Sequence, residues 1–206
     1  MLLFAFLVPL VSAALDAATR SEPFYLAVRS TNDTYNNKAV SACHQGALIT
    51  SLCITDQEVN LTSAPPFALN TITTPSGILE FNAPTAPNNQ TNETSTYFPM
   101  NFWWDVYTNV VMGFFQPLDA QQNIQPNQLM FAGEEGNELV MKGPVMNDTM
   151  APNWRPSPAN ETVNRWYVCD TWAPAPYQRT SVVWGLGAAE PQNPSCVKVD
   201  VVKVTT

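Results

Sequence analysis

Few residues in this chain are able to do chemistry, and most of those are carboxylates and aromatic rings. The 206 residues include one histidine, His44, which excludes a multi-histidine metal centre. A Ser-His-Asp triad would have to use His44, but no Gly-x-Ser-x-Gly nucleophile elbow is present. His44 follows Cys43, and we interpret it as a strand-edge side chain satisfied by nearby backbone. The sequence therefore predicts no metal site and no cofactor.

Paired carboxylates can hydrolyse glycosidic bonds without any histidine. The acidic candidates are Glu80, Asp105, Glu134, Glu135, Glu138 and Asp170. Asp105 and Asp170 lie near tryptophans, and aromatic neighbours can desolvate a carboxylate or line a sugar site. We interpret these acids as exposed residues at strand ends and expect a protein that is not an enzyme.

The aromatic residues raise a different question, because the chain has six Trp and six Tyr. Trp166 and Trp184 lie in apolar runs typical of strands, and we expect them in the core. Neighbouring residues of a strand point to opposite faces, so one ring of the Trp103–Trp104 pair is expected outside the core. An exposed ring can either pack under a loop or stack on a sugar. The candidate carbohydrate-binding residues are Trp103, Trp104, Trp172 and Tyr177.

Four cysteines allow three disulfide pairings. We expect the local one, which joins Cys43 to Cys53 and Cys169 to Cys196. The second bridge would close a loop of about 28 residues and remove roughly 3.6 kcal/mol of unfolded-state entropy in the chain-closure model. The Cys-x-x-Cys spacing of a structural zinc site is absent.

The first residues predict export. Residues 1–13, MLLFAFLVPLVSA, have the length and small-residue end of a signal peptide, and are too short to span a bilayer. Asn-x-Thr sequons provide an independent indication of a secreted glycoprotein. The six sequon asparagines are Asn32, Asn60, Asn89, Asn92, Asn147 and Asn160.

The composition of the chain disfavours some classes of binding partner. Charged residues make up 13% of the chain and the net charge is −8, which disfavours nucleic acid and anionic membranes as partners. Eighteen Pro and few Lys or Glu are typical of short strands joined by irregular loops. The sequence does not indicate an oligomeric state.

The elements that must position these residues are strands. Phe24–Ser30 is predicted as the first strand and 30–42 as a long turn, and short strands are expected at 47–49 and 52–54. Paired strands are predicted around Pro75–Gly77, Tyr107–Asn109 and Gly133–Asn137. Residues 83–99 are predicted as a mobile, glycosylated loop. The last forty residues predict three strands, RWYVCDT, TSVVWGLG and CVKVDVVKV, of which the first and third are joined by a disulfide.

These patterns predict one all-β domain over residues 21–206, with about ten to twelve short strands, long polar loops and two disulfides. A barrel, a β-trefoil-like fold and a sandwich all remain open.

The FYLAVRS strand, the LMFAGEEGNELVMKG hairpin and the WYVCDT…SVVWGLG…NPSCVKVDVVKV unit together resemble small secreted β-proteins of ascomycete fungi. The chain is similar to a fungal domain family of unknown function and, more distantly, to conidium/phialide-type cell-wall proteins. The resemblance implies a non-enzymatic role outside the cell or at the cell wall, with wall polysaccharide or a wall protein as partner. The alternative is a lectin-like carbohydrate-binding module that uses exposed aromatic residues.

Overall fold

The chain forms strands wherever apolar, β-branched and aromatic residues alternate or run together between polar, Pro-rich connections. The computed structural model describes residues 19–46, 49–62, 66–71, 76–84, 95–104, 108–115, 129–132, 136–142, 162–172 and 178–205. Fifteen strands lie in these ranges, and no helix does, so none of the described residues belongs to a helix able to cross a membrane.

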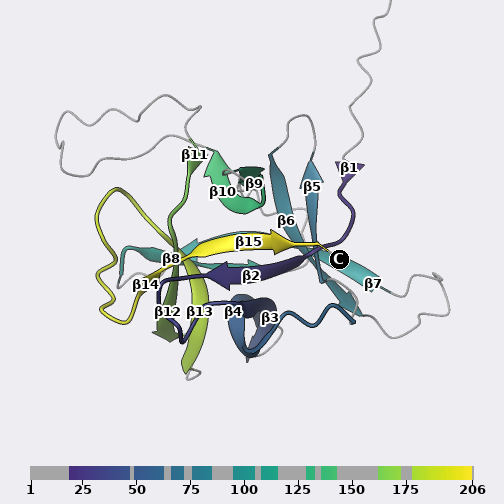
Figure 1. Cartoon of the computed structure of the whole chain (residues 1–206). Helices are drawn as coiled ribbons and strands as arrows, with labels where there is room; N and C mark the ends of the chain where they lie inside the picture. Colours follow the sequence, from purple (N-terminus) through teal and green to yellow (C-terminus); the bar gives the residue numbers. More distant parts are fainter. Residues whose placement is uncertain are drawn as a thin grey trace, which may run out of the picture.

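The first eight strands lie between Thr19 and Phe115 (Figure 1). They are β1 (Thr19–Arg20), β2 (Tyr25–Arg29), β3 (Lys38–Gly46), β4 (Ile49–Glu58), β5 (Phe67–Thr71), β6 (Gly77–Pro84), β7 (Ser95–Trp104) and β8 (Val110–Phe115). The other seven are β9 (Leu129–Ala132), β10 (Glu138–Lys142), β11 (Thr162–Val163), β12 (Trp166–Trp172), β13 (Gln178–Gly185), β14 (Val197–Lys198) and β15 (Asp200–Val204).

All fifteen strands belong to one antiparallel sheet. Its pairings close on themselves through β6, β7, β8, β4, β3, β2, β15, β10 and β9, which returns to β6. In Figure 1, β2 and β15 run side by side across the front, with β3 and β4 below them and β9 and β10 above. Strands β13, β12 and β14 continue the sheet outward from β8.

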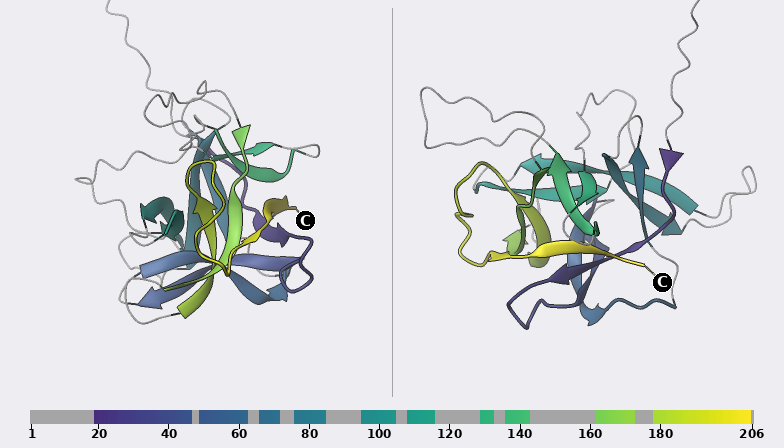
Figure 2. Two further views of the ribbon diagram at one scale, coloured as in Figure 1. Left: turned by 90° about the vertical axis from the view of Figure 1, so that its left-hand side faces the viewer. Right: turned by 45° about the horizontal axis from the view of Figure 1, so that its top comes forward.

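The main core is formed by side chains from the strands of this ring together with β5, β12 and β13, whose arrangement Figure 2 shows. Phe24, Leu26 and Val28 point to it from one face of the first long strand, as their spacing predicts. Trp166 and Trp184 meet edge to face in the same core, with ring centroids 5.1 Å apart.

A second, smaller cluster covers the opposite face of β8, β12 and β13. Its members are Val110, Met112, Phe114, Tyr167, Cys169 and Val183, with Cys196 packed against them. These strands are therefore apolar on both faces, which explains why their sequences run apolar instead of alternating.

The all-β class and the two predicted disulfides are confirmed. Cys43 is bonded to Cys53 and Cys169 to Cys196. Three of the fifteen strands are only two residues long. The twelve longer strands correspond to the predicted ten to twelve. The sheet is continuous, because every described strand is hydrogen-bonded into it.

Several predicted boundaries were wrong. The turn predicted over 30–42 ends at Asn37, and β3 runs from Lys38 to Gly46 before pairing with β4 as one long hairpin. The predicted loop 83–99 is shorter, since β6 extends to Pro84, β7 begins at Ser95, and the two pair to their ends. Residues 85–94 of that loop lie outside the described residues. The last predicted strand is two, β14 and β15, separated at Val199.

Candidate functional site

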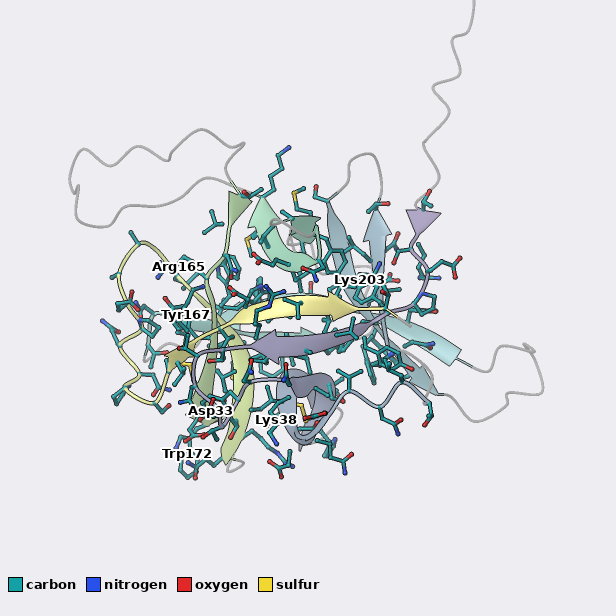
Figure 3. All side chains as sticks on the ribbon, in the orientation of Figure 1. Asp33, Lys38, Arg165, Tyr167, Trp172 and Lys203 are labelled. Atoms are coloured by element: carbon teal, nitrogen blue, oxygen red, sulfur yellow. A yellow bond between two sulfur atoms is a disulfide. The ribbon has the colours of Figure 1, made fainter. Side chains whose placement is uncertain are left out.

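A polar cleft of about 520 Å³ lies at the end of the molecule that β3, β4, β12 and β13 share. The lining residues come from the turn after β2, from the β3–β4 hairpin, and from the end of β12 and the beginning of β13. They are Thr34, Tyr35, Lys38, Cys43, Cys53, Ile54, Thr55, Asp56, Asp170, Gln178, Arg179 and Thr180. Figure 3 shows Lys38, Asp33 and Trp172 at this end of the molecule. Small-molecule sites typically span about 300–1,000 Å³, so the cleft is large enough for a short ligand.

The first wall is the turn between β2 and β3. The carbonyl of Asn32 accepts hydrogen bonds from the amides of Tyr35 and Asn36, both at 3.0 Å, which winds the chain into one tight turn. Asn37 then adopts φ 62°, a left-handed conformation that asparagine tolerates better than most residues. This geometry places Thr34 and Tyr35 at the cleft.

The second wall is the β3–β4 hairpin. Cys43 and Cys53 are bonded diagonally across it, with Cα atoms 5.9 Å apart, and both line the cleft. Lys38 Nζ donates to the carbonyl of Asp56 at 2.5 Å, which ties the beginning of β3 to the end of β4. The cation is thereby held at the cleft without a carboxylate partner among the described residues.

The third wall is formed by the end of β12 and the beginning of β13. Asp170 and Trp172 share the exposed face of β12, two residues apart, opposite Thr180 and Gln178 of β13. The Thr180 hydroxyl donates to Asp170 Oδ1 at 3.0 Å. Arg179 extends from the other face toward β3, where its guanidinium donates to the His44 carbonyl at 3.4 Å. The hairpin therefore brings a carboxylate, a guanidinium cation and an aromatic ring to one end of the cleft.

Trp172 is the outstanding feature of this end. It is 67% exposed, and its cross-strand partner Gln178 lines the cleft. Side chains directly opposite each other in a sheet lie about 4.5–5.5 Å apart at Cβ, so Trp172 adjoins the cleft through Gln178 without being one of its lining residues. An exposed indole beside hydroxyl, amide and charged groups is an arrangement that can stack on a sugar ring while its hydroxyls are hydrogen-bonded.

The structure brings together only part of the predicted sugar platform. Trp172 is exposed, at the end of β12 instead of in the Pro-rich turn that follows it. Trp103 and Trp104 lie on β7, opposite Met112 and Val111, and their side chains are outside the described residues. Tyr177 also lies outside them.

The predicted carboxylates do not gather in the described part of the chain. Asp170 lines the cleft, together with Asp56, which sequence reasoning had not selected. Glu80 is 5% exposed and forms an internal cluster, accepting from Arg20 Nε at 2.6 Å and Asn70 Nδ2 at 2.9 Å. Glu138 pairs with Arg29 at 3.8 Å. Asp105, Glu134 and Glu135 lie outside the described residues.

Two of the six sequons lie in described parts of the chain. Asn32 belongs to the turn that forms the first wall of the cleft. Asn60 is exposed after β4, and its Oδ1 accepts from both the amide and the hydroxyl of Thr62, at 3.0 and 2.7 Å. The sequons at Asn89, Asn92, Asn147 and Asn160 lie outside the described residues.

Another polar cluster anchors the loop that precedes β14. Arg165 donates to the carbonyls of Gly185, Ala188 and Ala189, and the Tyr167 hydroxyl donates to Glu190 at 3.3 Å. Burial raises the pKa of Tyr167, so this phenol stays protonated as a donor. The contacts of this cluster are internal and structural.

Lys38, Arg179 and Tyr35 were missed by sequence reasoning because the cleft joins segments more than a hundred residues apart. Nothing in the spacing of these residues indicates that they meet. Among the described residues, no three His, Cys, Asp or Glu side chains gather closely enough to hold a metal ion.

Comparison with known proteins places most of the chain in one family. A family model described as a domain of unknown function (DUF7907) matches residues 21–205. No curated protein and no solved structure matches the chain. The resemblance to a domain of unknown function is thereby confirmed at that level.

Proposed function

We propose that this chain, which belongs to the DUF7907 family, is a secreted, N-glycosylated, non-catalytic protein that binds carbohydrate at a cell surface or wall. The observation that carries the proposal is the exposed indole of Trp172 beside a polar cleft. An aromatic ring that is exposed next to a cleft of ligand size offers a stacking surface for a ligand bound there.

The lining of the cleft fits a sugar better than an apolar ligand. Threonine hydroxyls, the Gln178 amide and charged groups of both signs offer donors and acceptors for the hydroxyls of a pyranose ring. Charged partners make the stronger hydrogen bonds, and the Arg179 guanidinium offers several donors in one plane. Trp172 would contribute the stacking surface.

The exposure of the acids supports binding without hydrolysis. Asp56 and Asp170 line the cleft, and both are exposed to solvent. A glycosidase needs one carboxyl that remains protonated near neutral pH, which enzymes achieve by desolvation.

Export and wall association are supported by the sequence. A signal-peptide pattern, six sequons and two disulfides fit an oxidising, extracellular environment. The resemblance to small secreted fungal proteins suggests wall polysaccharides as the first ligands to test. A fungal wall offers chitin, β-glucan and mannan.

Pull-down by insoluble chitin, β-glucan and mannan tests the proposal, using secreted protein and the variant Trp172→Ala. Leu61→Ala is the matched control, because Leu61 is also an exposed apolar residue, at 48%, but does not line the cleft. We expect saturable binding by wild type and Leu61→Ala, and at least a tenfold loss in Trp172→Ala. Absence of binding to every polysaccharide would overturn the proposal and leave a structural role in the wall. Release of soluble sugar would instead indicate an enzyme.

A further inference from the structure

The turn that builds one wall of the cleft also carries a sequon. Asn32, Asp33 and Thr34 form the Asn-x-Thr triplet, and Thr34 itself lines the cleft. Asn32 Oδ1 accepts from the Thr34 amide at 2.9 Å, so the asparagine side chain lies directly against a residue of the cleft wall. A glycan on Asn32 would therefore begin within one side chain of the cleft.

The amide nitrogen of the Asn32 side chain is also available for glycosylation. The Oδ1 of this side chain is engaged by Thr34, and among the described residues no hydrogen bond involves its Nδ2. Nδ2 is the atom that becomes glycosylated. In an exported chain it forms a bond to C1 of the first sugar of a lipid-pyrophosphate-linked oligosaccharide. The bond from C1 to the pyrophosphate oxygen breaks, the lipid pyrophosphate leaves, and Nδ2 loses a proton.

We propose that an N-glycan on Asn32 lies over the mouth of the cleft and competes with external carbohydrate for it. This inference rests on the proposed function, since it concerns the same cleft. The protein would then be self-shielded, with its binding strength set by whether one sequon is occupied.

The expected size of the effect follows from tethering. A group held by a short flexible linker has an effective concentration on the order of millimolar at a neighbouring site. If the cleft binds a simple sugar with a dissociation constant on the order of 1 mM, the tethered glycan occupies it about half of the time. Apparent affinity for an external glycan then falls about twofold, and further where the glycan also blocks access sterically.

Asn32→Asp is the sharpest variant for this test. Aspartate removes the acceptor nitrogen but keeps an oxygen that can accept from the Thr34 amide, so the turn is preserved. Asp33→Asn is the matched control, because it changes the same turn, keeps the Asn-x-Thr sequon and alters a residue that does not line the cleft. Asn60→Asp removes a glycan from the turn after β4, where neither Asn60 nor its hydrogen-bond partner Thr62 lines the cleft.

The experiment combines three readouts on secreted full-length protein: site occupancy by glycopeptide mass spectrometry, polysaccharide affinity, and acrylamide quenching of Trp172 fluorescence. The Trp172 contribution to the quenching is isolated by subtracting the signal of Trp172→Phe. We expect Asn32 to be occupied, and Asn32→Asp to bind at least twofold tighter with faster quenching, while Asp33→Asn and Asn60→Asp behave as wild type.

The outcomes separate this inference from the proposed function. An unoccupied Asn32 would overturn the inference even if the protein binds polysaccharide. An occupied Asn32 whose loss changes neither affinity nor quenching would overturn it as well. Faster quenching in Asn32→Asp, with no polysaccharide bound by any variant, would support the shielding glycan and reject carbohydrate binding.

Discussion

At the scale of residues, two tryptophans of one strand have different roles, one in the core and one at the surface. Trp166 is fully buried, and its Nε1 donates to the Leu139 carbonyl at 2.7 Å, while Trp172, six residues later, is mostly exposed. Both occupy the same kind of sequence, a run of aromatic and β-branched residues. Six residues is an even spacing, so both rings project from the same face of β12. Position along the strand therefore decides which ring stabilises the fold and which is free to bind, since Trp166 packs in the main core and Trp172 lies at the exposed end.

We expect Trp166→Ala to lower the free energy of unfolding by about 3–5 kcal/mol, the usual cost of truncating a buried aromatic residue. Trp166→Phe should cost about 1–3 kcal/mol, because it leaves the buried Leu139 carbonyl without its donor. Trp172→Ala should change stability by less than about 0.5 kcal/mol. Urea denaturation of the three variants measures these differences, and a large loss in Trp172→Ala would contradict the assignment of this ring to the surface.

At the scale of elements, the two disulfides constrain loops of different length. Cys43 and Cys53 are 10 residues apart and join neighbouring strands of one hairpin. Cys169 and Cys196 are 27 residues apart, and their bridge joins β12 to the segment entering β14. Chain-closure entropy grows with the length of the loop, so the second bridge is expected to stabilise more.

In the chain-closure model, we expect Cys169→Ala/Cys196→Ala to lower the free energy of unfolding by about 3.6 kcal/mol, and Cys43→Ala/Cys53→Ala to lower it by about 2.8 kcal/mol. Guanidinium unfolding of the two double variants, compared with wild type, gives both losses. A greater loss for the shorter loop would show that contacts of the bridge in the folded state outweigh the entropy of the unfolded chain.

The elements also show how far the sequence alone could be read. Strands β12 and β13 were predicted correctly because their apolar runs are long and turn chemistry separates them, whereas the third predicted strand is divided at Val199 into β14 and β15. The beginning of β3 was missed because Lys38 follows a run of Asn and Thr typical of turns, and its strand is stabilised by pairing with β4. The end of the 83–99 loop was misplaced for the same reason, since Ser95 and Thr96 pair with β6 despite a polar sequence.

The candidate site was less predictable than the strands. The exposed face of Trp172 depends on the phase of β12, which a one-residue shift would reverse. The approach of Tyr35 and Lys38 to Arg179 depends on the connectivity of the whole sheet, for which local patterns carry no signal. Sequence reasoning could therefore propose Trp172 as a sugar contact, but could not assemble the cleft around it.

At the scale of the whole molecule, the ring of strands closes through a narrow contact. The pairing of β6 with β9 consists of Gly77 opposite Leu129, whereas most other strand pairs share several residues. Gly77 is also the first residue of β6, packed against the backbone of Asn70 and the side chain of Thr71. Gly77 therefore takes part both in the pairing of β5 with β6 and in the single pairing of β6 with β9 that closes the ring of strands.

We expect Gly77→Ala to destabilise the protein by about 1–3 kcal/mol, the usual cost of overpacking, because the added methyl would overlap backbone atoms of Asn70 that cannot move aside. The Gly77–Leu129 pairing should open first, so amide hydrogen exchange should quicken in β5, β6 and β9. Gly136→Ala is the control: its φ of 66° is also unfavourable for alanine, but the added methyl meets nothing within 4 Å. Amide hydrogen exchange in Gly136→Ala should quicken only within the β9–β10 hairpin. Equal, local effects of both substitutions would show that closure through Gly77 does not hold the ring of strands together.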